Sequence, residues 1–130
     1  MTRVEEYESL LERSRRFCET ASMQIEREFY DLVAFSLEQG LQLYLKACLL
    51  RLGIDYPGTH SLRRPLELIY KITQSEAIKD LLHKFSVELG ALEDAYIASR
   101  YVPRSYSLEE LERLEKVVEE VMAVVRGAIG

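Results

Sequence analysis

The stretch from Phe29 to Leu52 constrains the fold of this chain more than any other. At the roughly 100° per residue of an α-helix, its apolar side chains fall on two adjoining faces and leave a narrow polar strip. The strip consists of Glu38, Gln39, Gln42 and Lys46. A helix with so much apolar surface needs neighbours on nearly every side, so we expect it to be the central helix of a bundle. The polar residues also interrupt the apolar run, which makes the segment unsuited to crossing a bilayer.

The composition agrees with one helical domain. The chain has 130 residues, of which 48% are hydrophobic and 30% charged, with only 6 Gly and 3 Pro. Such a chain can bury a core without disulfides or metals, and its composition is not that of a disordered tail. The net charge of -5 argues against a surface that is basic throughout, as a general nucleic-acid-binding surface would be. A local basic patch is compatible with this charge.

The two cysteines, Cys18 and Cys48, both lie within helical apolar patterns. We therefore expect buried, reduced thiols and a reducing compartment, the cytoplasm. The chain begins with no signal peptide and carries no lipidation motif, so no attachment to a membrane is predicted.

Four further helices are predicted from apolar side chains at helical spacing. The first covers residues 2–25, and a turn must follow it, because one straight helix of about fifty residues would be far longer than ordinary helices. The last begins after Ser107, which forms a capping box with Glu110. The two others cover residues 61–73 and 75–101 and follow a turn-rich segment after the central helix.

The helix predicted at residues 75–101 has the sharpest pattern. Its inward stripe consists of Ile78, Leu81, Leu82, Phe85, Leu89, Leu92 and Tyr96. One turn further the stripe reaches Ser99 and Arg100, where an apolar side chain is expected. A charged residue such as Arg100 on an otherwise apolar helix face is typical of a functional residue or of an ion pair. Together the helices and their short connections predict an all-α fold, an antiparallel up-and-down bundle of four to five helices in a single domain, residues 1–130.

Short motifs along this chain resemble those of a known family. In chain order they are Tyr30-Asp31, Phe35, Gln39, Leu45-Lys46-Ala47, Gly53, Pro57, Thr59-His60-Ser61-Leu62, Tyr96 and Ser99-Arg100-Tyr101. This ordered set is similar to a HEPN domain, over roughly residues 29–103 in motifs and over the whole chain in helix order. The resemblance implies a bundle of four or five helices that forms a homodimer.

The resemblance to HEPN proteins implies two kinds of function. Many small members look like partners of minimal nucleotidyltransferases in prokaryotic two-protein modules. Others are metal-independent ribonucleases that place an arginine, roughly four to six variable residues and a histidine at the dimer cleft. Arg100 matches that arginine, but residues 105–107 are Ser, Tyr and Ser where the histidine is expected. The histidines of this chain, His60 and His83, lie elsewhere, so the ribonuclease hypothesis lacks its diagnostic residue.

Six residues are candidates for contact with a nucleotide or RNA: Lys46, His60, Arg63, Arg64, Arg100 and Tyr101. An RNA-cutting cleft needs an acid or base that works near neutral pH and a cation for the charge that develops on phosphate. Arg100 supplies only the cation, and it is equally suited to pair with a carboxylate on a neighbouring helix. Tyr101 either packs in the bundle or stacks on a base.

The other candidates also have a structural and a functional interpretation. His60 either bonds backbone at the entry to a helix, or contacts a phosphate or base with Arg63 and Arg64 at the positive end of that helix. Lys46 extends to solvent, pairs with a neighbour on the strip, or faces a dimer cleft. Neither a metal site nor a cofactor is predicted, because the His and Cys residues lack ligand spacing and no nucleotide-binding or nucleophile motif is present.

Two hypotheses of function follow, beside a purely structural one. The first is an interaction protein, a homodimer that binds or presents a nucleotide at a cleft containing Arg100 and acts with a nucleotidyltransferase-like partner, as in a toxin-antitoxin module. The alternative is a metal-independent endoribonuclease in which His60 or Tyr106 replaces the missing histidine. No residue is assigned a catalytic role. The surplus apolar face of the central helix favours a symmetric dimer.

Overall fold

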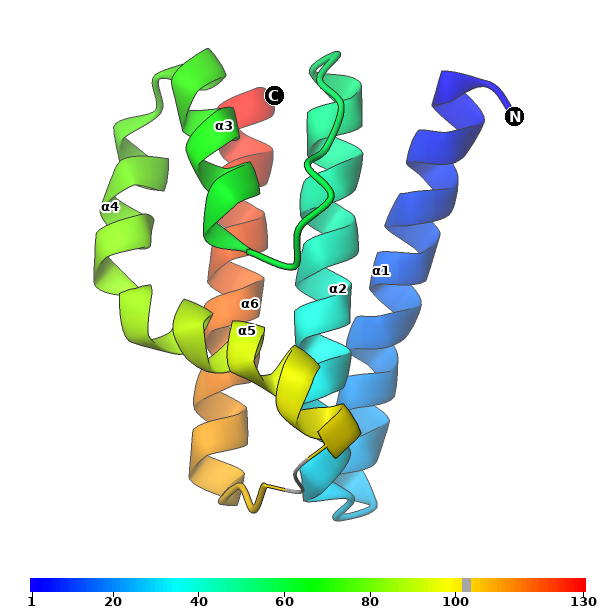
Figure 1. Cartoon of the computed structure of the whole chain (residues 1–130), viewed down its shortest axis with the longest axis vertical. Coiled ribbons are helices and arrows are strands. Elements are labelled where there is room, and N and C mark those ends of the chain that lie inside the picture. The colour runs from blue at the N-terminus through cyan, green and yellow to red at the C-terminus, as the bar shows by residue number, and fades with distance from the viewer. Residues whose placement is uncertain (102–103) are drawn as a thin grey trace.

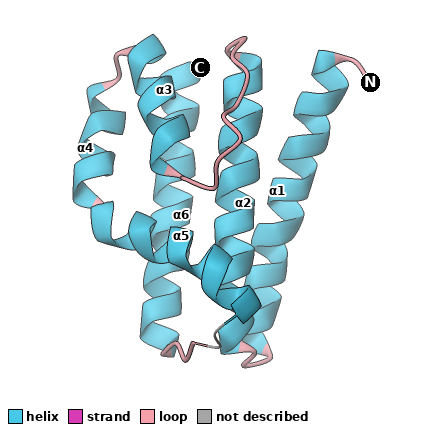
Figure 2. Cartoon of the chain, in the orientation of Figure 1, coloured by secondary structure: helices cyan, strands magenta, loops and turns pink. Residues whose placement is uncertain are grey.

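The computed structural model describes residues 1–101 and 104–130, without the side chains of residues 99–101. In this part of the chain six α-helices form a bundle, and there is no strand (Figures 1 and 2). They are α1 (Arg3–Glu26), α2 (Tyr30–Arg51), α3 (Arg63–Thr73), α4 (Glu76–Lys84), α5 (Ser86–Tyr101) and α6 (Leu108–Ile129). The predicted all-α bundle is confirmed. None of the described helices is long and apolar enough to cross a membrane.

Helix α2 lies at the centre, as its sequence predicts. Helices α1, α3, α5 and α6 all pack against it. Between Val33 and Leu50, only Phe35, Gln39 and Lys46 keep partial exposure. From Val33 to Leu50, the surplus apolar face that was expected to favour a dimer is covered by helices of the same chain, whereas Phe29 and Leu32 before it remain exposed. The covered part of that face gives no argument for a dimer.

Helices α1 and α2 form a closely packed hairpin. Gly40 permits this approach, since a Cβ atom at this position would lie 2.6 Å from the Sγ atom of Cys18. The hydroxyl of Ser14 donates a hydrogen bond of 2.6 Å to the carbonyl oxygen of Gly40. A second apolar cluster fills the same interface apart from the main core and consists of Leu10, Leu43, Ala47 and Leu50. The turn predicted between the two helices is present, with Glu28 in the left-handed region at φ 61°.

The prediction of one helix over residues 75–101 was wrong, because the chain bends at Phe85 and forms α4 and α5. Phe85 leaves helical geometry, with φ -106° and ψ 23°, and its ring is buried. A straight helix would present the whole apolar stripe to one line of neighbours. The bend lets α4 pack on α3 and α6 while α5 crosses α2 (Figure 1). Burial of both halves of the stripe therefore favours two helices.

Residues 52–62 return along α2 before α3 begins, so that α3 runs in the same direction as α2 (Figure 1). The side-chain amide of Gln42, in the middle of α2, donates to the carbonyl oxygen of His60 at 3.3 Å. Leu62 is fully buried and anchors the end of the segment. The connection thus places His60 beside α2 and not beyond its end.

The predicted start of the last helix is confirmed. The Ser107 hydroxyl accepts from the backbone N–H of Glu110 at 3.1 Å, and the Glu110 carboxylate accepts from the N–H of Ser107 at 3.2 Å. This capping box satisfies two donors that a helix end otherwise leaves unpaired. It fixes where α6 begins and therefore how its apolar face meets α2 and α4.

Candidate functional site

The polar strip of α2 divides into a buried part and an accessible part. Glu38 and Gln42 are buried beneath the returning segment and α5, whereas Gln39 and Lys46 remain partly exposed. The carboxylate of Glu38 accepts from the side-chain amides of Gln39 at 2.7 Å and Gln42 at 2.9 Å. These bonds connect the core to the surface on which Gln39 lies.

Burial raises the pKa of Glu38 from its ordinary value of 4.5 to about 7. The hydrogen bond from Gln39 and the charge of Lys46 act in the opposite direction, and the nearby carboxylate of Glu93 adds to the rise. Desolvation is the larger effect because a charged carboxylate loses its hydration in the core. A group that takes up or releases a proton near neutral pH therefore lies directly behind the candidate site. The helical pattern included Glu38 in the polar strip but could not show that other elements cover it.

Three rings meet where α5 crosses α2. The imidazole of His60 stacks on the ring of Tyr96, with centroids 4.0 Å apart and planes inclined by 25°. Tyr96 also contacts Phe35 of α2, with a centroid separation of 6.2 Å. His60 is exposed, and the two other rings are partly exposed. All three belong to the motif set of the sequence, but their spacing did not predict that they come into contact.

Lys46 lies further along the same side of α2. Its Nζ atom is 5.1 Å from the ring centroid of Tyr56, which comes from the returning segment. The hydroxyl of Tyr56 donates to Glu6 of α1 at 3.4 Å. A partly exposed lysine over an aromatic ring keeps its charge available at the surface. Lys46 and the three rings of Phe35, His60 and Tyr96 thus line one accessible side of α2.

Glu93 of α5 engages the start of α3. Its Oε2 atom accepts from the backbone N–H of Leu62 at 2.7 Å and from that of Arg63 at 3.5 Å. The guanidinium of Arg63 lies 3.8 Å from the same carboxylate and donates to the carbonyl of Ser86 at 2.7 Å. The N-terminus of α3, which the sequence suggested as a contact for a phosphate, is therefore already bound by the carboxylate of Glu93. Arg64 is exposed on the outer side of this helix start.

Arg100 and Tyr101 lie in the last turn of α5, one helical turn beyond Tyr96. Their side chains fall outside the part of the chain that the structure describes. Tyr106, the other residue considered in place of the missing histidine, is buried at 9% exposure, and the guanidinium of Arg104 lies 4.5 Å from its ring centroid. Within the described residues, no three His, Cys, Asp or Glu side chains are grouped as metal ligands.

Comparison with known proteins agrees with the order of helices and motifs. The sequence profile of the HEPN domain matches residues 7–128, from the first turns of α1 to the last turn of α6. No curated protein matches the chain. The match extends over nearly the full length and includes every residue described above around α2 except Glu6 of α1. The chain therefore belongs to the HEPN domain family.

Proposed function

We propose that this HEPN protein binds a nucleotide or RNA on the accessible side of α2 and acts with a nucleotidyltransferase-like partner. The observation that carries the proposal is the His60–Tyr96 stack, which lies one turn before Arg100 on α5. Exposed rings bind bases of any sequence by stacking, and arginine and lysine contact phosphate. The His60 ring, Lys46 and position 100 together offer both kinds of contact. Membership of the HEPN family supports a nucleotidyltransferase-like partner. In this proposal the two proteins form a toxin-antitoxin pair.

In this proposal the protein works as a homodimer. The accessible strip of α2, with Phe35, Gln39 and Lys46, faces the second copy. A two-fold axis near this strip would bring the ends of two α5 helices to one cleft. Each copy would then add Arg100 to a shared ligand site.

Calorimetric titration with ATP, AMP and a single-stranded RNA oligonucleotide tests the binding proposal. We expect His60→Ala and Arg100→Ala each to weaken binding roughly tenfold, because each removes a stacking or charged contact worth about 1–3 kcal/mol. His83→Ala is the matched control, since His83 is an exposed histidine of α4. Binding that is equal in all three variants would contradict the proposed site. A folded protein with no affinity for any of these probes would favour a scaffold.

An endoribonuclease is the second candidate, and the position of His60 favours it over an enzyme based on Tyr106. His60 is exposed and stacks on α5 near the turn that carries Arg100, whereas Tyr106 is buried. An imidazole there would act as acid or base and Arg100 would stabilise charge on the phosphate. Cleavage of single-stranded RNA in EDTA that disappears in both His60→Ala and Arg100→Ala would support this enzyme. No cleavage by the folded wild-type protein would exclude it.

A further inference from the structure

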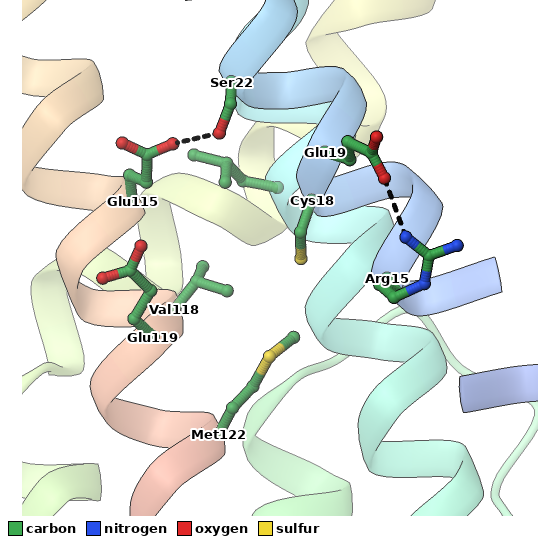
Figure 3. A pocket seen from close by; sticks show the side chains of 9 residues that line it. Arg15, Cys18, Glu19, Ser22, Glu115, Val118, Glu119 and Met122 are labelled. Atoms are coloured by element: carbon green, nitrogen blue, oxygen red, sulfur yellow. Dashed lines mark hydrogen bonds and ion pairs between the residues drawn. The ribbon is translucent and has the colours of Figure 1, made fainter. Parts of the chain in front are cut away.

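A groove of about 310 Å³ lies between α1 and α6, and the proposed function does not use it (Figure 3). Its floor is mostly apolar and is formed by Cys18, Leu37, Val118 and Met122. In the close view, the side chains of Cys18, Val118 and Met122 point into the space between the two helices. The groove forms because α1 packs mainly on α2 and hardly touches α6. Leu37 and Val118 at its base are each 1% exposed, and Cys18 and Met122 are partly exposed.

Carboxylates line both edges of this groove. Glu19 stands on α1, and Glu115 and Glu119 stand on α6 (Figure 3). Arg15 is the basic residue of the lining, and it pairs with Glu19 at 2.8 Å and also with Glu12 on its own helix. Its charge is therefore compensated within α1, which leaves both carboxylates of α6 without a basic neighbour in the lining.

Two further observations describe the same surface. The hydroxyl of Ser22 donates to the carboxylate of Glu115 at 3.0 Å, which ties α1 to α6 at one end of the groove. Partial burial, together with the charges of Glu115 and Glu119, raises the pKa of Cys18 to about 11. The negative potential therefore reaches the apolar floor. An apolar floor beside the acidic edge of α6 complements a helix with one apolar face and basic residues beside it.

We propose that the groove between α1 and α6 binds a basic amphipathic helix of a protein partner. A second copy of this chain fits less well, because the net charge of -5 would bring acidic edges together. The groove also lies on the other side of α2 from the candidate site. Leu37 is two residues from both Phe35 and Gln39, a rotation of about 200° on a helix. A partner in the groove would thus leave the ligand site accessible, and the proposal goes beyond the proposed function.

The test uses a designed helical peptide of leucine and lysine, about 15 residues long, with leucines at helical spacing on one face. A matched peptide carries glutamate in place of lysine. Alkylation of Cys18 by a neutral reagent at pH 9, followed by mass spectrometry, reports occupancy of the groove. Cys48 is 1% exposed, so Cys18 is the thiol that reacts in the folded protein. The groove variant carries both Glu115→Gln and Glu119→Gln. The control variant carries both Glu67→Gln and Asp80→Asn, at exposed positions of α3 and α4.

We expect the lysine peptide to protect Cys18 and the glutamate peptide to leave it reactive. The groove variant should weaken binding roughly five- to tenfold, as two exposed ion pairs allow, and the control variant should bind as the wild type does. Both variants are checked for folding by circular dichroism. Unprotected Cys18, or equal weakening in both variants, would overturn the proposal. Protection that grows with protein concentration, without peptide, would assign the groove to a second copy and would also overturn it.

Discussion

Glu38 illustrates how one residue links the core of this bundle to the solution. Its carboxyl group is buried, and two glutamine amides hold it next to the segment that carries His60. In the folded protein its pKa is raised to about 7, so the folded state binds this proton more tightly than the unfolded chain does. The free energy of unfolding therefore falls as the pH rises from about 4.5 to about 7.

We predict that Glu38→Gln removes this part of the pH dependence. Between pH 5 and pH 8 the wild type should lose on the order of 2 kcal/mol of unfolding free energy relative to the variant, because the variant has no proton to release. Urea unfolding at several pH values measures the difference. Glu67→Gln, a change at an exposed glutamate of α3, should keep the wild-type slope. A parallel pH profile for wild type and Glu38→Gln would show that Glu38 is not the titrating group.

Gly40 gives a second prediction at the scale of a residue. Gly40→Ala should lower the free energy of unfolding by about 1–3 kcal/mol, because the new methyl group meets the Sγ atom of Cys18. The double variant with Cys18→Ala should recover part of the loss, since it removes that sulfur. Gly127→Ala is the control, because a Cβ atom there meets nothing within 4 Å and alanine favours the helix. Equal effects at both glycines would contradict the close contact of α1 and α2.

Glu93 connects two elements in a way that the sequence did not indicate. A glutamate on α5 serves as the cap of α3, although about thirty residues separate the two. Caps are recognised in a sequence when the capping residue directly precedes its helix, as Ser107 precedes α6. Thr59 and Ser61 are the residues of capping type that shortly precede α3. Ser61 does accept from Arg64, but the N–H groups of Leu62 and Arg63 are bound from another helix.

We predict that Glu93→Ala loosens the start of α3 and the end of the returning segment. Amide hydrogen exchange at Leu62 and Arg63 should become faster, and the free energy of unfolding should fall by about 1.5–3 kcal/mol, because a charged acceptor of two N–H groups is lost. Asp94→Ala, at the exposed neighbouring position, should change neither quantity by much. Unchanged exchange at Leu62 in Glu93→Ala would refute this role.

At the scale of elements, the sequence predicted where helices form better than how they are oriented in the bundle. The central helix and the capped last helix were correct because their apolar faces and caps lie within the elements themselves. The bend at Phe85 was missed because the apolar stripe continues through it without a Gly or Pro, so that only the positions of α2 and α6 reveal it. The sequence predicted residues of the candidate site but not their arrangement, which also depends on how distant segments pack. The stack of His60 on Tyr96 depends on how residues 52–62 return along α2.

For the whole molecule, the proposed homodimer can be tested by charge reversal. Lys46→Glu should shift the protein toward the monomer in light scattering, because Lys46 lies on the strip of α2 that faces the second copy in this proposal. Lys71→Glu makes the same change at an exposed site of α3 and should leave the mass unchanged. A wild-type protein that stays monomeric at high micromolar concentration would contradict the dimer, as would equal behaviour of the two variants.

The hairpin of α1 and α2 has a consequence for the order of folding. Its own apolar cluster around Leu10 and Leu43, which is separate from the main core, joins segments that are close in sequence. Little chain entropy is therefore lost when these segments meet. We expect this hairpin to be formed in the transition state. Leu10→Ala should therefore slow folding, whereas Val121→Ala in α6, which is buried in the main core, should mainly accelerate unfolding. Stopped-flow kinetics would thus find a nucleus at the beginning of the chain, to which the later helices attach.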